Sequence, residues 1–287
     1  MRFVRFDGGR LGILRGEAVV DATDLVGEDR SWPPTLVRRL VEGFGRLRPQ
    51  LEARLARGPG IPLAAVRLEA PVVHPSKIVG AYANYLAHHR EMGGTDARAA
   101  EPPEVFLKAP SSIIGPGEAI RLPPLPGREV HHEAELAVVI GTRARRVRAA
   151  DALACVFGYT GLMDITVRGS GERSRRKSYD TFTPVGPCVV TADEIPDPHA
   201  LDIALWVDGT LRQRGNTRDM VFDIARLIEY TTAVMTLEPG DLLATGTPEG
   251  VGPINGAREV RLEIGGIGRL AVRVEPSQAA PAGAAVG

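Results

Sequence analysis

Two glutamates stand directly before an apolar run in residues 130–141, VHHEAELAVVIG. In a strand, alternate side chains share one face and each residue rises about 3.3 Å, so Glu133 and Glu135 would lie about 6.6 Å apart on one face. Carboxylates held this close repel each other, and burying one without a partner is costly. The pattern therefore indicates a bound cation or a shared proton. A solvated strand end is the alternative, because Glu is mostly an exposed residue.

A third carboxylate, Asp164, follows an apolar run in residues 157–171, FGYTGLMDITVRGSG. Asp is common in turns, so a turn cap is the local alternative. Together with Glu133 and Glu135, however, Asp164 would complete an all-oxygen ligand set, which suits Mg²⁺ or Mn²⁺ better than zinc. Three carboxylates would also leave coordination positions open for a substrate.

A candidate general base lies in residues 84–93, NYLAHHREMG. If this segment is helical, His88 and Glu91 lie at i and i+3 on one face, within reach of each other. A carboxylate beside an imidazole fixes its tautomer and favours its charged form, which is how a general base is built. The alternative is an exposed pair that stabilises a helix by a few tenths of a kcal/mol.

A basic cluster occupies residues 168–187, RGSGERSRRKSYDTFTPVGP, and such runs are usually solvated loops. We assign a site role only to Lys177, because it directly precedes a segment that looks ordered and can hold an ammonium group in place. Residues 245–252, TGTPEGVG, match neither a Walker loop nor a dinucleotide-binding fingerprint, and alone indicate only tight turns.

The elements that must position these residues are mostly strands. Alternating runs up to Asp24 predict a small antiparallel meander, and residues 35–56 predict a helix that Gly43, Gly45 and Pro49 break or kink. Residues 58–63, GPGIPL, have the composition of a linker. From Val66 onward the chain favours strands, with one strongly periodic helix in residues 217–235. We predict an α+β, mostly β fold, with a small N-terminal domain (1–70), a catalytic domain (71–275) and a disordered tail (276–287).

The bulk composition excludes several classes of partner. The 287 residues carry 35 Lys plus Arg against 35 Asp plus Glu, which favours neither nucleic acid nor an anionic membrane surface. The sequence has no apolar run of membrane-spanning length and no secretory signal, so we expect a cytoplasmic protein. Cys155 and Cys188 are too few for a disulfide framework, and we interpret both as small buried apolar residues.

Taken in order along the chain, these segments resemble the fumarylacetoacetate hydrolase superfamily, in its branch of acylpyruvases and hydroxyheptadienedioate isomerases. The similarity runs from about Lys77 to Pro253. It rests on seven ordered motifs, which are NYxxHxxE (84–91), VFLK (105–108), HHExEL (131–136), LMD (162–164), KSYDTFTPVGP (177–187), LRQRGNT (211–217) and TGTPEGVG (245–252). The resemblance implies a mixed β-roll main domain, a small N-terminal α/β domain and a homodimer.

The resemblance also implies a role for each candidate residue. Glu133, Glu135 and Asp164 would bind Mg²⁺ or Mn²⁺, with Ca²⁺ as an alternative, and His88 with Glu91 would form the catalytic dyad. Lys177 would be a further catalytic residue, and the substrate-binding residues would be Tyr85, Gln213 and Thr247. One position departs from the pattern, since Ala83 stands where many acylpyruvase-like members carry Arg or Leu.

The two histidines before Glu133 would have different roles. His131 would share the face of the glutamates and orient one carboxylate, whereas His132 would face the other way. Residues 138–140 would anchor the strand in the core and so fix the ligand geometry.

The expected function is divalent-metal-dependent hydrolysis of a C–C bond in a β-dicarbonyl, acylpyruvate-like acid, as in aromatic catabolism. The oxo acid would chelate the ion, which stabilises the enolate formed when the bond breaks, while His88 deprotonates the attacking water. Lys177 would stabilise developing negative charge. Decarboxylation or isomerisation of a related oxo acid on the same site is the alternative. A second alternative is a non-catalytic protein that binds metal and oxo acid. It is disfavoured because a structural ion needs no general base beside it.

Overall fold

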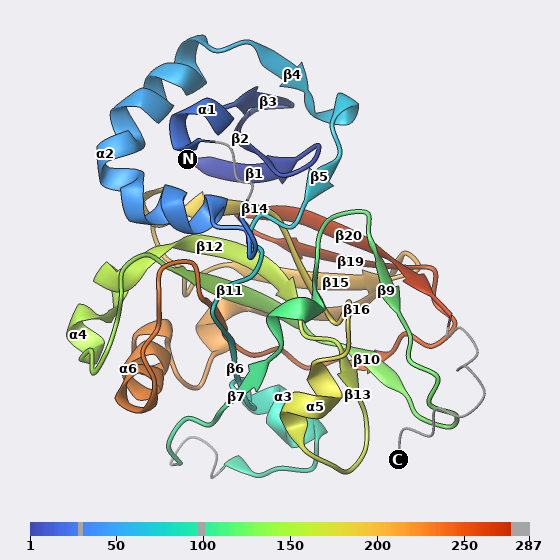
Figure 1. Ribbon diagram of the computed structural model, residues 1–287. Coiled ribbons are helices and arrows are strands. Elements are labelled where there is room, and N and C mark those ends of the chain that lie inside the picture. The colour runs from blue at the N-terminus through green and yellow to red at the C-terminus, as the bar shows by residue number, and fades with distance from the viewer. Residues whose placement is uncertain (28–30, 97–100, 277–287) are drawn as a thin grey trace.

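Strands dominate the computed structural model of the chain, which describes residues 1–27, 31–96 and 101–276 (Figure 1). The strands are β1 Arg2–Phe6, β2 Arg10–Arg15, β3 Ala18–Asp21, β4 Gly60–Pro62, β5 Leu68–Glu69, β6 Ile78–Ala81, β7 Val105–Lys108, β8 Ile113–Ile114, β9 Ala119–Arg121, β10 Val130–His132, β11 Ala134–Ile140, β12 Val156–Met163, β13 Thr166–Val167, β14 Thr183–Thr191, β15 Asp202–Val207, β16 Thr210–Asn216, β17 Leu242–Ala244, β18 Gly252–Pro253, β19 Glu259–Ile264 and β20 Gly268–Glu275.

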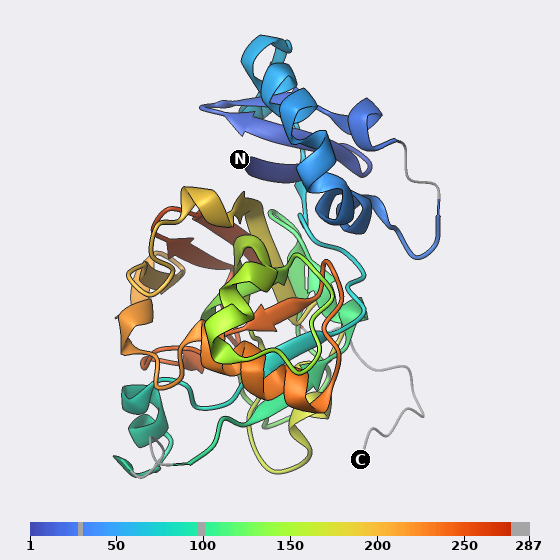
Figure 2. The same cartoon turned by 90° about the vertical axis from the view of Figure 1, so that its left-hand side faces the viewer.

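Six α-helices are described, and they lie at the periphery of the sheets (Figures 1 and 2). They are α1 Thr23–Val26, α2 Leu36–Arg57, α3 Leu86–Glu91, α4 Ala149–Ala152, α5 Arg173–Lys177 and α6 Ile224–Val234. The strongly periodic segment predicted in residues 217–235 contains α6. In the described part of the chain, no helix combines the length and the apolar character needed to cross a membrane.

The strands form three sheets, which confirms the predicted α+β, mostly β fold. The largest sheet has 12 strands in the order β4-β3-β2-β1-β14-β12-β11-β17-β6-β7, with β5 paired to β1 and β8 paired to β14. A five-stranded sheet has the order β16-β15-β19-β20-β9, and β13-β10-β18 form a third. β10 and β11, which flank Glu133, therefore belong to different sheets.

The N-terminal segment contains the predicted meander of β1, β2 and β3, with α2 packed against it through Leu36, Leu40 and Leu51. The helix is not broken at its glycines, because α2 runs from 36 to 57 with Pro49 inside it and bends along its length in Figure 1. The prediction of a linker at 58–63 was wrong. Residues 60–62 form β4, which pairs with β3 at the sheet edge, where a proline is tolerated.

The N-terminal strands continue the sheet of the main body, because β1 pairs antiparallel with β14 through Arg2 opposite Val190 and Phe3 opposite Val189. In Figure 1 these strands and α2 lie above the larger part of the molecule. The division at residue 70 remains a prediction. The predicted disordered tail falls, apart from its first residue, outside the described residues.

The core is centred on β11, in which all seven residues are buried. Leu136, Val138 and Ile140 pack into one hydrophobic cluster, and Ala137 and Val139 into a second, as the alternation of a strand between two layers requires. This burial confirms that residues 138–140 anchor the strand. It also fixes the position of Glu135, near the other end of the strand.

Candidate active site

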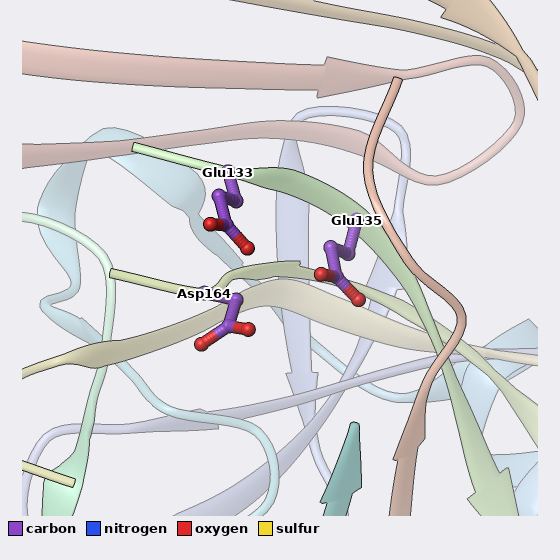
Figure 3. Close-up of side chains that lie close together, drawn as sticks. All are labelled: Glu133, Glu135 and Asp164. Carbon is purple, nitrogen blue, oxygen red and sulfur yellow. The ribbon is translucent and has the colours of Figure 1, made fainter. Parts of the chain in front are cut away.

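Strand register brings the three predicted metal ligands together. Glu135 lies in β11 opposite Leu162 of β12, and Asp164 follows the end of β12. The Asp164 amide donates a hydrogen bond of 2.8 Å to the Glu133 carbonyl oxygen, which fixes these two residues side by side. Each side chain offers one oxygen within 4.8 Å of the other two, and Figure 3 shows the three carboxylates grouped. All three residues are buried, with exposures of 5% or less.

The segment that carries the glutamates is not one continuous strand. β10 ends at His132 and β11 begins at Ala134, so Glu133 lies at the junction between two sheets. The prediction that Glu133 and Glu135 lie close together is confirmed. Its reason, the alternation of side chains along one continuous strand, was wrong. The junction brings Glu133 to Asp164, while Glu135 keeps its place in the strand.

The two histidines before Glu133 differ as expected in direction. His131 Nδ1 accepts a hydrogen bond of 2.9 Å from Arg168 Nε, and its Nε2 lies 2.9 Å from the Glu129 carboxylate, so both ring nitrogens are paired with residues other than the three predicted metal ligands. The guanidinium of Arg168 in turn lies 3.3 Å from a carboxylate oxygen of Glu133, so any influence of His131 on that carboxylate passes through Arg168. His132 faces the other way, with its Nδ1 2.9 Å from the side-chain oxygen of Gln213.

Two buried lysines neutralise much of the negative charge of the carboxylates. Lys177 Nζ lies 2.7 Å from Glu133 and 2.6 Å from Asp164, and it donates to Thr166 Oγ1 at 2.7 Å. Lys108 Nζ donates to the other oxygen of Asp164 and, at 3.0 Å, to the Phe182 carbonyl. Lys108 was not predicted as a site residue, although its placement at the end of the apolar motif VFLK was a usable signal.

Among the described residues, no lysine or arginine lies in ion-pair contact with Glu135. In the described structure its carboxylate accepts a hydrogen bond only from the Gly246 amide, at 2.7 Å. Burial and the nearby charges of Asp164 and Glu133 raise the pKa of Glu135 well above its ordinary value. Burial acts in the same direction on Glu133, but Lys177 and Arg168 outweigh it and hold the pKa of Glu133 at about 2.

The residues present therefore fit a hard divalent cation. A buried carboxylate without a positive partner requires charge compensation, and the three converging groups offer only oxygen ligands. Mg²⁺ and Mn²⁺ prefer such ligands, whereas zinc sites in proteins are built mainly from Cys and His. Glu133, Glu135 and Asp164 would hold the ion.

The predicted dyad is assembled on α3, which confirms that residues 86–91 are helical. His88 Nδ1 lies 2.9 Å from one carboxylate oxygen of Glu91, and the other oxygen accepts a hydrogen bond of 3.0 Å from the Gly250 amide. The Asn84 side chain ties the start of this helix to the backbone of Phe222 and Thr245. The helix and the TGTPEGVG loop are thus held together as one unit.

His88 of the dyad lines the same cavity as Glu133 and Glu135, and this cavity has a volume of about 280 Å³. Its walls are formed by Ala81, Tyr82, Ala83, His88, Met92, Phe106, Glu133, Glu135, Thr166, Arg168, Gly169, Arg173, Arg176, Lys177 and Thr247. Ala83 presents only a methyl group there. The three arginines were passed over by sequence analysis, because charge runs in loops are usually solvated.

The predicted substrate-binding residues occupy different layers of the site. Thr247 lines the cavity. Gln213 lies behind it, fully buried, and its amide nitrogen donates to Thr247 Oγ1 at 2.8 Å and to the Pro248 carbonyl at 2.7 Å. Tyr85 is also buried and is not among the cavity-lining residues described, and no hydrogen-bond partner reaches its hydroxyl within the described chain.

Comparison with known proteins identifies relatives over nearly the full length. The chain is 38% identical over 285 residues to a maleylpyruvate hydrolase of Aquipseudomonas alcaligenes, covering 96% of this chain and 99% of that one. It is 48% identical to the maleylpyruvate hydrolase of Sphingobium sp. SYK-6, whose crystal structure contains manganese(II) and pyruvate. The match has a TM-score of 0.88 and covers 97% of this chain and 100% of that one. A mitochondrial oxaloacetate tautomerase of Rattus norvegicus is 40% identical over 242 residues, covering 83% of this chain and 75% of the relative.

The family model for the C-terminal domain of fumarylacetoacetate (FAA) hydrolase matches residues 77–275. That range contains all nine predicted site residues, and it extends the resemblance inferred from the motifs to the end of β20. The chain therefore belongs to the fumarylacetoacetate hydrolase family, as an enzyme of its carbon–carbon hydrolase class.

Proposed function

We propose that the chain is a metal-dependent maleylpyruvate hydrolase, which adds water to maleylpyruvate and releases maleate and pyruvate. One observation carries the proposal. Two carboxylates of a buried group that needs a cation, Glu133 and Glu135, line the same cavity as His88 of the dyad. The full-length similarity to two maleylpyruvate hydrolases supports this choice of substrate.

Glu133, Glu135 and Asp164 would hold Mn²⁺ or Mg²⁺. When bound, such an ion supplies Lewis acidity that stabilises negative charge on an oxo acid. Lys177 and Lys108 hold Asp164 from both oxygens, and Lys177 also holds Glu133, so these carboxylates are oriented before a substrate arrives. Such support from surrounding groups fixes the geometry of a metal site.

The dyad supplies the base. Glu91 accepts the Nδ1 proton of His88, which leaves the Nε2 lone pair as the acceptor for a proton of water. The substrate carbons are numbered here from the carboxylate of the pyruvate end. The water oxygen then bonds to the C4 carbonyl carbon. The C3–C4 bond breaks, and its electron pair stays on C3 of the pyruvate fragment. The protonated His88 returns its proton to C3, so that water has been added across the broken bond and the base is regenerated.

Two further residues orient or stabilise the substrate in this proposal. Gln213 donates to Thr247 Oγ1, so the Thr247 hydroxyl proton is directed away from Gln213 and is available to a substrate oxygen in the cavity. The fixed charge of Lys177 stabilises negative charge that develops nearby. In this arrangement Gln213 does not contact the substrate and instead orients Thr247. Tyr85 is buried directly before α3 and supports the start of that helix.

Proton transfer without water attack is the second candidate. The same His88 can move a proton between carbon and oxygen of a related oxo acid, and the tautomerase from rat is 40% identical to this chain. Decarboxylation would use the same carboxylates and would not need His88 to activate water. A binding protein without activity would have no use for a base in the cavity, and the intact His88–Glu91 pair favours an enzyme.

Product analysis separates these reactions. The purified chain with Mn²⁺ is incubated with maleylpyruvate, acetylpyruvate and oxaloacetate, and the products are identified by mass. We expect pyruvate and maleate in equal amounts from maleylpyruvate. Products of unchanged mass would support isomerisation, and carbon dioxide from oxaloacetate alone would support decarboxylation.

The expected assembly and location also belong to this proposal. We infer a homodimer from the family and a cytoplasmic location from the sequence, and no contact between copies enters the mechanism above. Light scattering on a sizing column measures the assembly directly, and a monomer at micromolar concentration would contradict the dimer.

A further inference from the structure

Three arginines line the cavity beside the metal ligands, and they differ in how their charge is matched. Arg173 lies 2.6 Å from Glu104 and 3.6 Å above the Tyr82 ring, so a carboxylate and an aromatic face already engage it. Arg168 lies 3.3 Å from Glu133 and contacts His131. Both guanidinium groups therefore have partners within the protein.

Arg176 is the exception. Its Nε donates to the Gly171 carbonyl at 3.2 Å and its Nη1 to the Val167 carbonyl at 3.1 Å, and both acceptors are neutral. Within the described part of the chain, no carboxylate lies in ion-pair distance of it. Burial, and then repulsion by Arg173 and Arg168, lowers the pKa of Arg176. A half-buried guanidinium held in place by backbone carbonyls thus carries unmatched positive charge on the cavity wall.

The charges around the cavity indicate what would match it. Glu133, Glu135 and Asp164 carry three negative charges when they hold a metal ion. Lys108, Lys177 and Arg168 carry three positive charges in ion-pair contact with Glu133 or Asp164. The charge of a bound divalent cation is then unmatched by the protein and would attract one carboxylate of an oxo acid. Arg176 is additional to this balance, so a substrate with a single carboxylate would leave it unmatched.

We propose that Arg176 binds the distal carboxylate of the substrate and so makes this cavity selective for dicarboxylic oxo acids. The inference rests on the proposed function, in which the other end of the same substrate lies at the metal ligands. The planar guanidinium donates parallel hydrogen bonds to a carboxylate, and such charge-assisted pairs are among the strongest in proteins. Arg176 is then a specificity-determining residue, and Arg173 and Arg168 keep the region positive.

Equilibrium binding tests the inference without requiring turnover. In the presence of Mg²⁺, calorimetry compares 2-oxoheptanedioate with 2-oxoheptanoate, which have the same chain length and differ in the distal carboxylate. We expect wild type to bind the diacid at least about 10-fold more tightly, the effect of one charge-assisted hydrogen-bonded pair. Arg176→Gln should remove most of this preference by weakening diacid binding alone, and Arg176→Lys should retain part of it.

Arg175→Gln is the matched control, because Arg175 is exposed on the same helix and does not line the cavity. It should leave the preference unchanged. Equal binding of the two acids by wild type would overturn the inference. So would an Arg176→Gln variant that loses affinity equally for both acids, since that result would indicate a structural role.

The proposed function can fail separately from this inference. If wild type prefers the diacid but releases no pyruvate from maleylpyruvate, the carboxylate subsite stands and hydrolysis is wrong. Wild type could hydrolyse acetylpyruvate and maleylpyruvate with equal kcat/KM, and Arg176→Gln could leave both values unchanged. In that case hydrolysis stands and the subsite is wrong.

Discussion

The Gly246 amide donates a 2.7 Å hydrogen bond to Glu135, and it is the only group in the described structure that does so. A single amide cannot balance a buried carboxylate charge, which normally requires a pairing cation or protonation. Glu133 and Asp164 each contact at least one lysine, so Glu135 is the carboxylate on which a metal ion has the most effect.

Glu135→Gln should therefore abolish tight metal binding and leave the fold intact, because an amide of the same shape replaces the charge. We expect the affinity for Mn²⁺ measured by calorimetry to fall at least about 100-fold, the scale of losing one charged ligand. Glu129→Gln is the control, since the Glu129 side chain is exposed and pairs with His131 rather than with a predicted metal ligand. Unchanged Mn²⁺ affinity in Glu135→Gln would show that the ion binds elsewhere.

His88→Ala should separate catalysis from binding. Removing the base should lower kcat for maleylpyruvate by about 100-fold or more, the usual contribution of general acid–base catalysis, with little change in the affinity for oxalate. Glu91→Gln should lower kcat less than His88→Ala does, because an imidazole whose tautomer is less fixed can still accept a proton. His89→Ala, on the same helix but outside the cavity lining, should retain wild-type turnover. Wild-type rates in both dyad variants would refute the assignment.

Lys108→Met should make the protein more dependent on metal for stability. Lys108 and a metal ion both compensate the charge of the buried Asp164 group, so removing the lysine should lower the free energy of unfolding by about 3 kcal/mol without metal. Saturating Mn²⁺ should then stabilise the variant more than wild type in urea unfolding. An equal loss with and without Mn²⁺ would mean that the lysine and the ion act independently.

The two cysteines should differ in reactivity. Burial raises the pKa of the Cys188 thiol to about 12, so at pH 8 roughly one such thiol in ten thousand is ionised and reactive. Cys155 is half-buried, which corrects the prediction that both cysteines are buried. A disulfide reagent at pH 8 should modify Cys155 alone in the native protein, and Cys188 only after unfolding, as read by mass spectrometry. The rate of modification should rise with pH, since a larger fraction of each thiol is then ionised to thiolate. Rapid native modification of a Cys155→Ser variant would contradict this.

Sequence patterns indicated two of the predicted metal ligands and the dyad because the partners in each pair are close in the chain, whereas Asp164 was added from a separate apolar run and from the family resemblance. Glu133 and Glu135 are two residues apart, and His88 and Glu91 lie within one helical turn. Lys108 could not be assigned in the same way, because its partner Asp164 is 56 residues away and only the pairing of distant strands brings them together. The strand break at Glu133 also depends on pairing with other strands, to β13 and β18 on one side and to β12 and β17 on the other.

Composition was misleading where tertiary contacts outweighed local tendency. Residues 60–62 have a linker composition, yet they pair with β3 and complete the edge of the N-terminal sheet. The arginines of 168–176 look like a solvated run, yet α5 and the preceding loop turn three of them toward the cavity. A local pattern records which residues are charged, whereas the fold determines which of those charges share a cavity.

The most direct test of the central claim follows the oxygen of water into the product. The chain with Mn²⁺ is incubated with maleylpyruvate in water enriched in oxygen-18, and the products are analysed by mass spectrometry. Hydrolysis predicts that maleate gains oxygen-18 in its new carboxylate, in step with the release of pyruvate, and that His88→Ala forms almost none. A substrate that changes only by isomerisation, or is consumed without labelled maleate, would contradict water attack at the C4 carbonyl.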